Sequence, residues 1–158
     1  MLDFEHHNNP RVRQAYKIAR EAHKYQKDKS GKEYIIHPMT VASNVGNNVS
    51  AIILALLHDI VEDHSNKYNI NILKREIHLG VYEVEALKLL THDKGVPYFD
   101  YIDKIKSNEL AVTVKLADLQ HNSDRNRLLT VTPKDEKRFK KYIKAINILN
   151  ETVRNNAD

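Results

Sequence analysis

The chain has 158 residues, of which 41% are apolar and 29% are charged. This composition is typical of one globular domain with a sizeable apolar core, and it excludes a disordered chain. The 25 lysines and arginines exceed the 21 acids by only four, so the charge does not indicate a nucleic-acid-binding protein, although it is compatible with an anionic small substrate.

Membrane insertion and disulfide bonding are also excluded. The longest apolar run, residues 51–57, is far shorter than the roughly 20 residues that cross a bilayer. The first residues lack the basic and apolar regions of a secretory signal. Because cysteine is absent, no disulfide or thiolate metal site can form, and we expect a cytoplasmic protein.

The first half of the chain predicts three helices. Asn9-Pro10 has the form of a helix start, with a capping side chain followed by proline at the first helical position. His37-Pro38 repeats this pattern of an extended residue before a proline. Residues 51–60 then form a helix that is apolar nearly all round, so we expect it at the centre of the domain.

Helical spacing continues to the end of the chain. We predict helices over residues 70–77, 81–90, 98–106 and 111–119. Thr132 to Asp135 resembles a capping box that opens a last helix. That helix is expected to turn five side chains inward: Phe139, Tyr142, Ile143, Ile146 and Leu149. The prediction is therefore an all-α fold of about seven to nine helices in a single domain over residues 1–158.

Ionisable groups occur where a plain helical core would not place them. His37 stands at the entrance of an apolar helix, the His58-Asp59 doublet ends the most apolar helix, and Asp118 lies within another apolar stretch. Buried groups of this kind are normally paired or bound to a metal. Two imidazoles and two carboxylates suit Mn²⁺, Fe²⁺, Zn²⁺ or Co²⁺, any of which can activate water as a nucleophile.

Two features qualify this metal hypothesis. Glu62 follows His58 by four residues, so it lies one turn away and within reach of the reaction only if the helix continues. His58 and Asp59 are adjacent, and adjacent side chains on a helix point about 100° apart. Periodicity therefore does not by itself predict that both reach one ion.

Three segments resemble the hydrolase domain of RelA/SpoT proteins and its metazoan homologue, within the HD-domain phosphohydrolases. HKYQKDKSGKEYIIHP at 23–38 is similar to the family's H-x-x-Q-x-R-K-x-G-x-x-Y-I-x-H-P. ALLHDIVED at 55–63 is similar to A-L-L-H-D-V-V-E-D, and KLADLQHN at 115–122 to K-L-A-D-R-L-H-N. The resemblance runs from about His23 to Arg127, which is roughly two-thirds of the chain.

The resemblance implies an HD-type helical bundle and a role for nine residues. The metal ligands, usually for Mn²⁺, would be His37, His58, Asp59 and Asp118. The catalytic acids would be Glu62 and Asp63, and the substrate would contact Lys29, Ser30 and Asn122. The family reaction removes pyrophosphate from the 3′ position of guanosine tetra- or pentaphosphate. Since no synthetase-like segment follows, we expect a stand-alone hydrolase.

One departure from the family pattern concerns the substrate. Asp28 stands where the family has an arginine that is expected to stack on guanine, and aspartate can neither stack on a purine nor attract phosphate. Another nucleotide, such as NADPH or a deoxynucleotide, is therefore an alternative substrate. A degenerate domain kept for regulation is a further alternative, which the complete set of ligands and acids disfavours.

Each candidate residue also has a simpler interpretation. Asp118 could be a buried acid paired with Lys115, three residues earlier on the same helix face. Glu62 and Asp63 could be a charged helix end. We expect His121 to support the site and three other histidines to lie on the surface: His64, His78 and His92. The sequence leaves the native metal and the oligomeric state open.

Overall fold

The computed structural model describes residues 1–157, which form nine α-helices and one short 3₁₀-helix. Within these residues there is no β-strand, only an isolated bridge between Lys27 and Glu33. The predicted all-α class and helix number are confirmed. No helix in this part of the chain combines the length and apolar character needed to span a membrane. The single-domain boundary remains a prediction.

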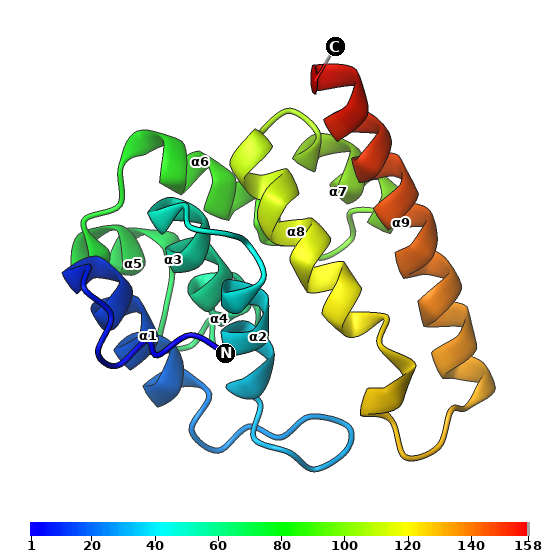
Figure 1. Cartoon of the computed structure of the whole chain (residues 1–158), viewed down its shortest axis with the longest axis horizontal. Coiled ribbons are helices and arrows are strands. Elements are labelled where there is room, and N and C mark those ends of the chain that lie inside the picture. The colour runs from blue at the N-terminus through cyan, green and yellow to red at the C-terminus, as the bar shows by residue number, and fades with distance from the viewer. Residues whose placement is uncertain (158) are drawn as a thin grey trace.

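The first four helices include the predicted central segment. α1 (Pro10–Ala22) begins after Asn9, whose side chain accepts a hydrogen bond from Arg11 N, as the capping pattern predicted. α2 (Ile36–Ser43), α3 (Val49–Leu57) and the single turn α4 (Ile60–Asp63) follow. α3 contacts α1, α2, α6 and α8, and every residue of 51–57 is buried. The most apolar segment therefore does lie at the centre (Figure 1).

The second half of the chain closes around that centre. α5 (Ile70–Ile77) ends at the exposed His78, and α6 (Val81–Leu90) packs on α3 and α8. α7 (Tyr98–Ile105) contacts α6 and α9. α8 (Glu109–Asn122) and α9 (Pro133–Ala157) lie side by side, linked through the 3₁₀-helix η1 (Arg125–Arg127) (Figure 1). One wall of the molecule is thus an α8–α9 hairpin.

Two predicted details are wrong. The helix over residues 51–60 is interrupted, because α3 ends at Leu57 and α4 begins only at Ile60. Ile143, expected to face inward on the last helix, is 52% exposed. The capping box at the start of α9 is confirmed: Thr132 Oγ1 accepts a hydrogen bond from Asp135 N, and Asp135 Oδ2 accepts one from Thr132 N.

Candidate metal centre

Four side chains from three distant segments converge beside the core. His37 comes from α2, the His58-Asp59 doublet from the α3–α4 junction, and Asp118 from α8. His37 Nε2 lies 2.9 Å from Asp118 Oδ1 and 3.4 Å from Asp59 Oδ2. His58 Nε2 lies 3.3 Å from each of the same two oxygens. The structure therefore brings together all four residues that the sequence singled out as ligands.

Two neighbouring residues, His58 and Asp59, reach one place at the junction between α3 and α4. Both keep right-handed helical backbone angles, with φ −60° and ψ −29° at His58 and φ −94° and ψ −11° at Asp59. Adjacent side chains on a helix point about 100° apart. His58 Nε2 nevertheless lies 3.3 Å from Asp59 Oδ2, so the two side chains meet between their directions.

These distances suit a metal ion. Neighbouring donor atoms on an octahedral ion with bonds of about 2.1 Å lie about 3 Å apart. One donor atom from each of His37, His58 and Asp59 fits within a 4.8 Å group, and Asp118 Oδ1 is close to both imidazoles. Mixed imidazole nitrogen and carboxylate oxygen donors are the set expected for a divalent transition ion. The residues present therefore fit such an ion.

Surrounding groups fix the orientation of these side chains. His58 Nδ1 lies 2.6 Å from Ala55 O, and since a carbonyl only accepts, Nδ1 carries a proton, and in the neutral ring Nε2 keeps its lone pair for a metal. Tyr34 Oη donates to Asp59 Oδ2 at 2.7 Å. Lys115 Nζ and Asn122 Nδ2 donate to Asp118 at 2.8 and 3.0 Å. Lys115 thus pairs with Asp118, as the simpler interpretation proposed, while Asp118 Oδ1 still faces the imidazoles.

His121 supports the centre from behind. Its Nδ1 lies 2.7 Å from His37 Nδ1, and the two rings are stacked. Burial, together with the nearby Arg127 cation, lowers the pKa of His121 to about 4, so it is neutral near pH 7. A neutral His121 can accept the His37 Nδ1 proton, which leaves the lone pair of His37 on Nε2. The expected supporting role agrees with this contact.

The charges of the centre favour a bound cation. Burial raises the pKa of Asp118, but the Lys115 ammonium and the two imidazoles outweigh it and hold that pKa well below its usual value. The pKa of Asp59 is also lowered by His58 and His37, against the effect of burial. Burial lowers the pKa of His58, but the same carboxylates raise it to about 9. The carboxylates are thus ionised and attract positive charge, whether a proton or a metal.

The two predicted catalytic acids are placed differently. Glu62 lines the pocket that contains His58, Asp59 and Asp118, and its Oε1 accepts a hydrogen bond from His92 N. Partial burial raises the pKa of Glu62 above its ordinary value. Asp63 is not among the residues that line this pocket.

Asp63 instead belongs to a hydrogen-bonded group beside the centre. Its Oδ2 accepts from Gln26 Nε2 at 3.0 Å, and Gln26 Oε1 lies 2.7 Å from both His23 Nδ1 and His64 Nε2. His64 was expected on the surface, but it is half-buried and contacts Gln26, so that prediction is wrong. The sequence signal for this group was the H-x-x-Q spacing that opens the first matching segment.

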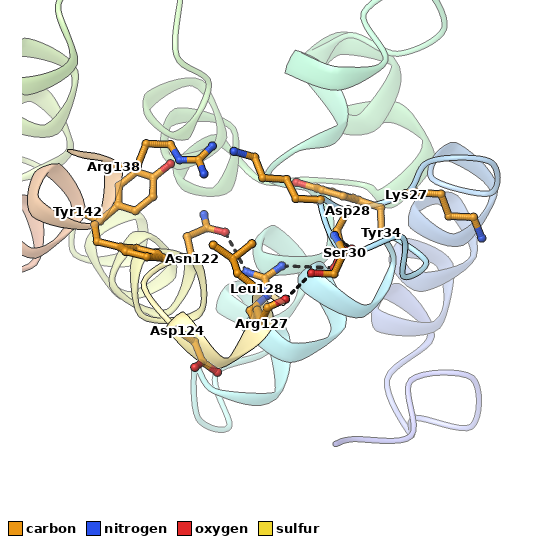
Figure 2. Close-up of a pocket in the computed structure, with 12 residues that line it drawn as sticks. Lys27, Asp28, Ser30, Tyr34, Asn122, Asp124, Arg127, Leu128, Arg138 and Tyr142 are labelled. Atoms are coloured by element: carbon orange, nitrogen blue, oxygen red, sulfur yellow. Dashed lines mark hydrogen bonds and ion pairs between the residues drawn. The ribbon is translucent and has the colours of Figure 1, made fainter. Parts of the chain in front are cut away.

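The pocket lined by His58, Asp59 and Asp118 is called the metal pocket, and a second, outer pocket adjoins it. The metal pocket has a volume of about 310 Å³ and the outer pocket about 320 Å³, and they share Tyr34, Asn122 and Tyr142 as walls. The three predicted substrate contacts all line the outer pocket: Lys29, Ser30 and Asn122. Figure 2 shows Ser30 and Asn122 beside Arg127, to which both are hydrogen-bonded. Their substrate role remains a prediction.

Asp28, the departure from the family pattern, shapes the loop of this outer pocket. Its Oδ1 accepts hydrogen bonds from Ser30 N at 2.8 Å and Lys32 N at 3.0 Å, and its Oδ2 lies 3.9 Å from Arg127 (Figure 2). An aspartate at this position therefore holds a turn. An arginine here would lose both backbone hydrogen bonds.

Several pocket residues were not predicted from the sequence. His92, expected on the surface, is half-buried, stacks on Tyr101 and lines the metal pocket. Tyr98, Tyr101 and Lys141 line the same pocket from α7 and α9. These residues lie outside the three family-like segments, so no motif indicated them.

Comparison with known proteins finds similarity to (p)ppGpp synthase/hydrolases and 3′-pyrophosphohydrolases. It is 32% identical over 124 residues to the bifunctional (p)ppGpp synthase/hydrolase SpoT of Escherichia coli, covering 71% of this chain and 17% of that protein. A guanosine-3′,5′-bis(diphosphate) 3′-pyrophosphohydrolase of Haemophilus influenzae is 35% identical over 117 residues, which are 66% of this chain and 17% of the relative. This chain is close to the RelA/SpoT hydrolases.

The similarity covers only a small part of each relative. A probable GTP pyrophosphokinase of Mycobacterium leprae is 30% identical over 128 residues, which are 75% of this chain and 16% of that protein. The chain thus spans about a sixth of the length of the RelA/SpoT relatives it matches. No family model matches the chain.

Proposed function

We propose that this chain is a metal-dependent nucleotide phosphohydrolase of the HD type, acting as a (p)ppGpp 3′-pyrophosphohydrolase in the cytoplasm. The convergence of two imidazoles and two carboxylates from α2, the α3–α4 junction and α8 carries this proposal. Its similarity to SpoT and to 3′-pyrophosphohydrolases supports the choice of substrate class. The single-domain extent over residues 1–158 belongs to the same proposal.

The chain's own residues would divide the work in the following way. His37, His58, Asp59 and Asp118 would hold the metal, for which we propose Mn²⁺. A divalent ion bound there supplies Lewis-acid stabilisation of phosphoryl charge and activation of water. Tyr34, Lys115 and the Ala55 carbonyl keep the ligands oriented, which is a common requirement of metal sites.

Proton transfer is assigned to Glu62. Its raised pKa lies closer to neutrality than that of an ordinary carboxyl group, which suits a group that accepts and returns a proton near pH 7. Asp63 would act from outside the pocket, by way of its hydrogen bond to Gln26. Lys29, Ser30 and Asn122 would contact the nucleotide in the outer pocket.

The test is a substrate panel on the protein purified without chelator. Bound metal is measured first, and then release of pyrophosphate or phosphate is followed with Mn²⁺ and ppGpp, NADPH or a deoxynucleoside triphosphate. Pyrophosphate from ppGpp is the expected result. If phosphate is released from NADPH and nothing from ppGpp, the proposed substrate is wrong but metal-dependent hydrolysis is retained. Metal bound without turnover of any nucleotide would overturn the enzymatic proposal in favour of a regulatory domain.

A further inference from the structure

Part of the wall of the metal pocket comes from α7 and α9. Tyr98 and Tyr101 come from α7, and Lys141 and Tyr142 come from α9, so the wall unites two helices that carry none of the metal ligands. The rings of Tyr98 and Tyr142 lie 6.4 Å apart between centroids. This wall contains two polar groups that lack the partners such groups normally have.

The first is the hydroxyl of Tyr98. It is buried from solvent, yet it has no hydrogen-bond partner within the described residues. Tyr101 on the same helix differs, because its hydroxyl donates to Leu90 O at 2.8 Å. Leaving a buried hydroxyl unpaired costs free energy, so native structures rarely keep one without a ligand or water to satisfy it.

The second is the ammonium group of Lys141. Its Nζ lies 4.5 Å from the centroid of the Tyr98 ring and 5.4 Å from that of Tyr142, so the two rings hold the cation at the pocket wall. Lys115, the other lysine that lines this pocket, pairs with Asp118. Lys141 forms no ion pair with any of residues 1–157.

Among the described residues, Lys141 therefore adds an unpaired positive charge to this part of the pocket. Burial, followed by the nearby Arg138 and Lys115 cations, lowers the pKa of Lys141, which is the direction expected where cations repel one another. An anion placed between Lys141 and Tyr98 would relieve this repulsion and accept the Tyr98 hydroxyl proton in a hydrogen bond. Phosphoryl oxygens have the charge and the lone pairs for both contacts.

We propose that Lys141 and the Tyr98 hydroxyl form an anion subsite that binds a phosphoryl oxygen of the substrate in the metal pocket. This inference rests on the proposed function for the identity of the ligand as a phosphate ester or anhydride. It assigns to α7 and α9 the charge-recognition part of the site. The α2, α3–α4 and α8 segments then supply the metal ligands.

Binding of inorganic pyrophosphate tests the subsite without turnover. Calorimetric titrations of the Mn²⁺-loaded protein would compare the wild type with Lys141→Gln, Tyr98→Phe and the control Lys140→Gln, which changes an exposed lysine outside both pockets. We expect affinity to fall about tenfold in Lys141→Gln and about fivefold in Tyr98→Phe, with the control unchanged. Bound Mn²⁺ should remain the same in all four proteins.

Several outcomes would overturn the subsite. Affinities of both variants within about twofold of wild type would do so, as would the same loss in Lys140→Gln, since the effect would then be a general one of surface charge. Wild-type protein that binds no pyrophosphate at millimolar concentration would also refute it. Lys141→Arg, which restores the cation, should recover most of the affinity, and failure of this rescue would count against the role of charge.

Turnover separates this inference from the proposed function. If the subsite binds substrate, Lys141→Gln should raise KM for ppGpp more than it lowers kcat. If no nucleotide is hydrolysed but pyrophosphate binding depends on Lys141 and Tyr98, the proposed reaction fails and the subsite stands. If ppGpp is hydrolysed with unchanged KM in both variants, the reaction stands and the subsite fails.

Discussion

Two buried carboxylate clusters in this protein differ in what completes them. Glu83 on α6 accepts hydrogen bonds from Arg11, from Ser50 Oγ at 2.7 Å and from Gly80 N at 2.9 Å, so both its oxygens are occupied by donors of the chain. The candidate metal centre differs from this cluster. There, two imidazole nitrogens face two carboxylate oxygens at one place: Nε2 of His37 and His58, and one oxygen each of Asp59 and Asp118.

The difference separates a structural cluster from a candidate site. The Glu83 cluster balances donors against acceptors and joins the start of α1 to α6, so it needs nothing further. The metal centre has an excess of acceptors at its middle, while its donors, Tyr34, Lys115 and Asn122, bind from outside. A cation is the group that balances such an arrangement.

The largest expected effect comes from removing one ligand. Asp59→Ala deletes an oxygen that faces both imidazoles, so bound Mn²⁺ should fall to background and hydrolysis should be lost. Metal analysis after dialysis and a pyrophosphate-release assay measure the two results. Asp124→Ala, an exposed acid of the outer pocket, should keep its metal. Full metal content in Asp59→Ala would show that the cluster is not a metal centre.

The next effect isolates proton transfer from metal binding. Glu62→Ala should retain Mn²⁺ but lower kcat by about 10²- to 10⁴-fold, the usual contribution of a general acid or base. Glu85→Ala, which changes an exposed glutamate outside the pocket, serves as the control. Normal turnover in Glu62→Ala would remove this residue from the mechanism.

A smaller effect is expected from the outer partners of the ligands. Tyr34→Phe removes only the hydroxyl that donates to Asp59, so metal affinity should fall by about 10- to 100-fold. Competition with a metal-binding dye would give the affinity. The matched change Tyr25→Phe affects a ring that is 86% exposed and should have no effect. Equal affinities in the two variants would mean that the Tyr34 hydroxyl does not orient Asp59.

The Glu83 cluster should affect stability but not metal binding. Glu83→Gln should lower the free energy of unfolding by about 2 kcal/mol at pH 7, the value for a hydrogen bond to a charged group. Despite burial, the Gly80, Ser50 and Arg11 donors lower the pKa of Glu83. Its stabilising effect is therefore present above the ordinary pKa of 4.5 and is lost as pH falls through the lowered pKa.

Urea unfolding at pH 7 and near pH 3 would measure both parts of that prediction. The difference in the free energy of unfolding between wild type and Glu83→Gln should become smaller as the pH falls, because the wild-type carboxylate becomes protonated. Metal content per folded molecule should match wild type throughout. Loss of metal in Glu83→Gln would break the distinction between the two clusters.

The sequence was sufficient for most of the helices and for the four ionisable residues that the structure brings together. Helix starts at Asn9 and Thr132 depend on side-chain caps, which act over three residues and are therefore visible in sequence. The apolar segment 51–57 had to lie at the centre because no face of it could meet water. His37, His58, Asp59 and Asp118 were found because ionisable groups in apolar stretches need partners.

Only the tertiary structure decided how those groups meet and what surrounds them. His58 Nε2 lies 3.3 Å from Asp59 Oδ2, a contact between adjacent residues that helical periodicity does not predict. Gln26 reaches Asp63, and Tyr98 meets Lys141, across long sequence separations set by helix packing. Local physics determines where helices begin and which faces are apolar, whereas contacts between distant side chains exist only once the helices have packed.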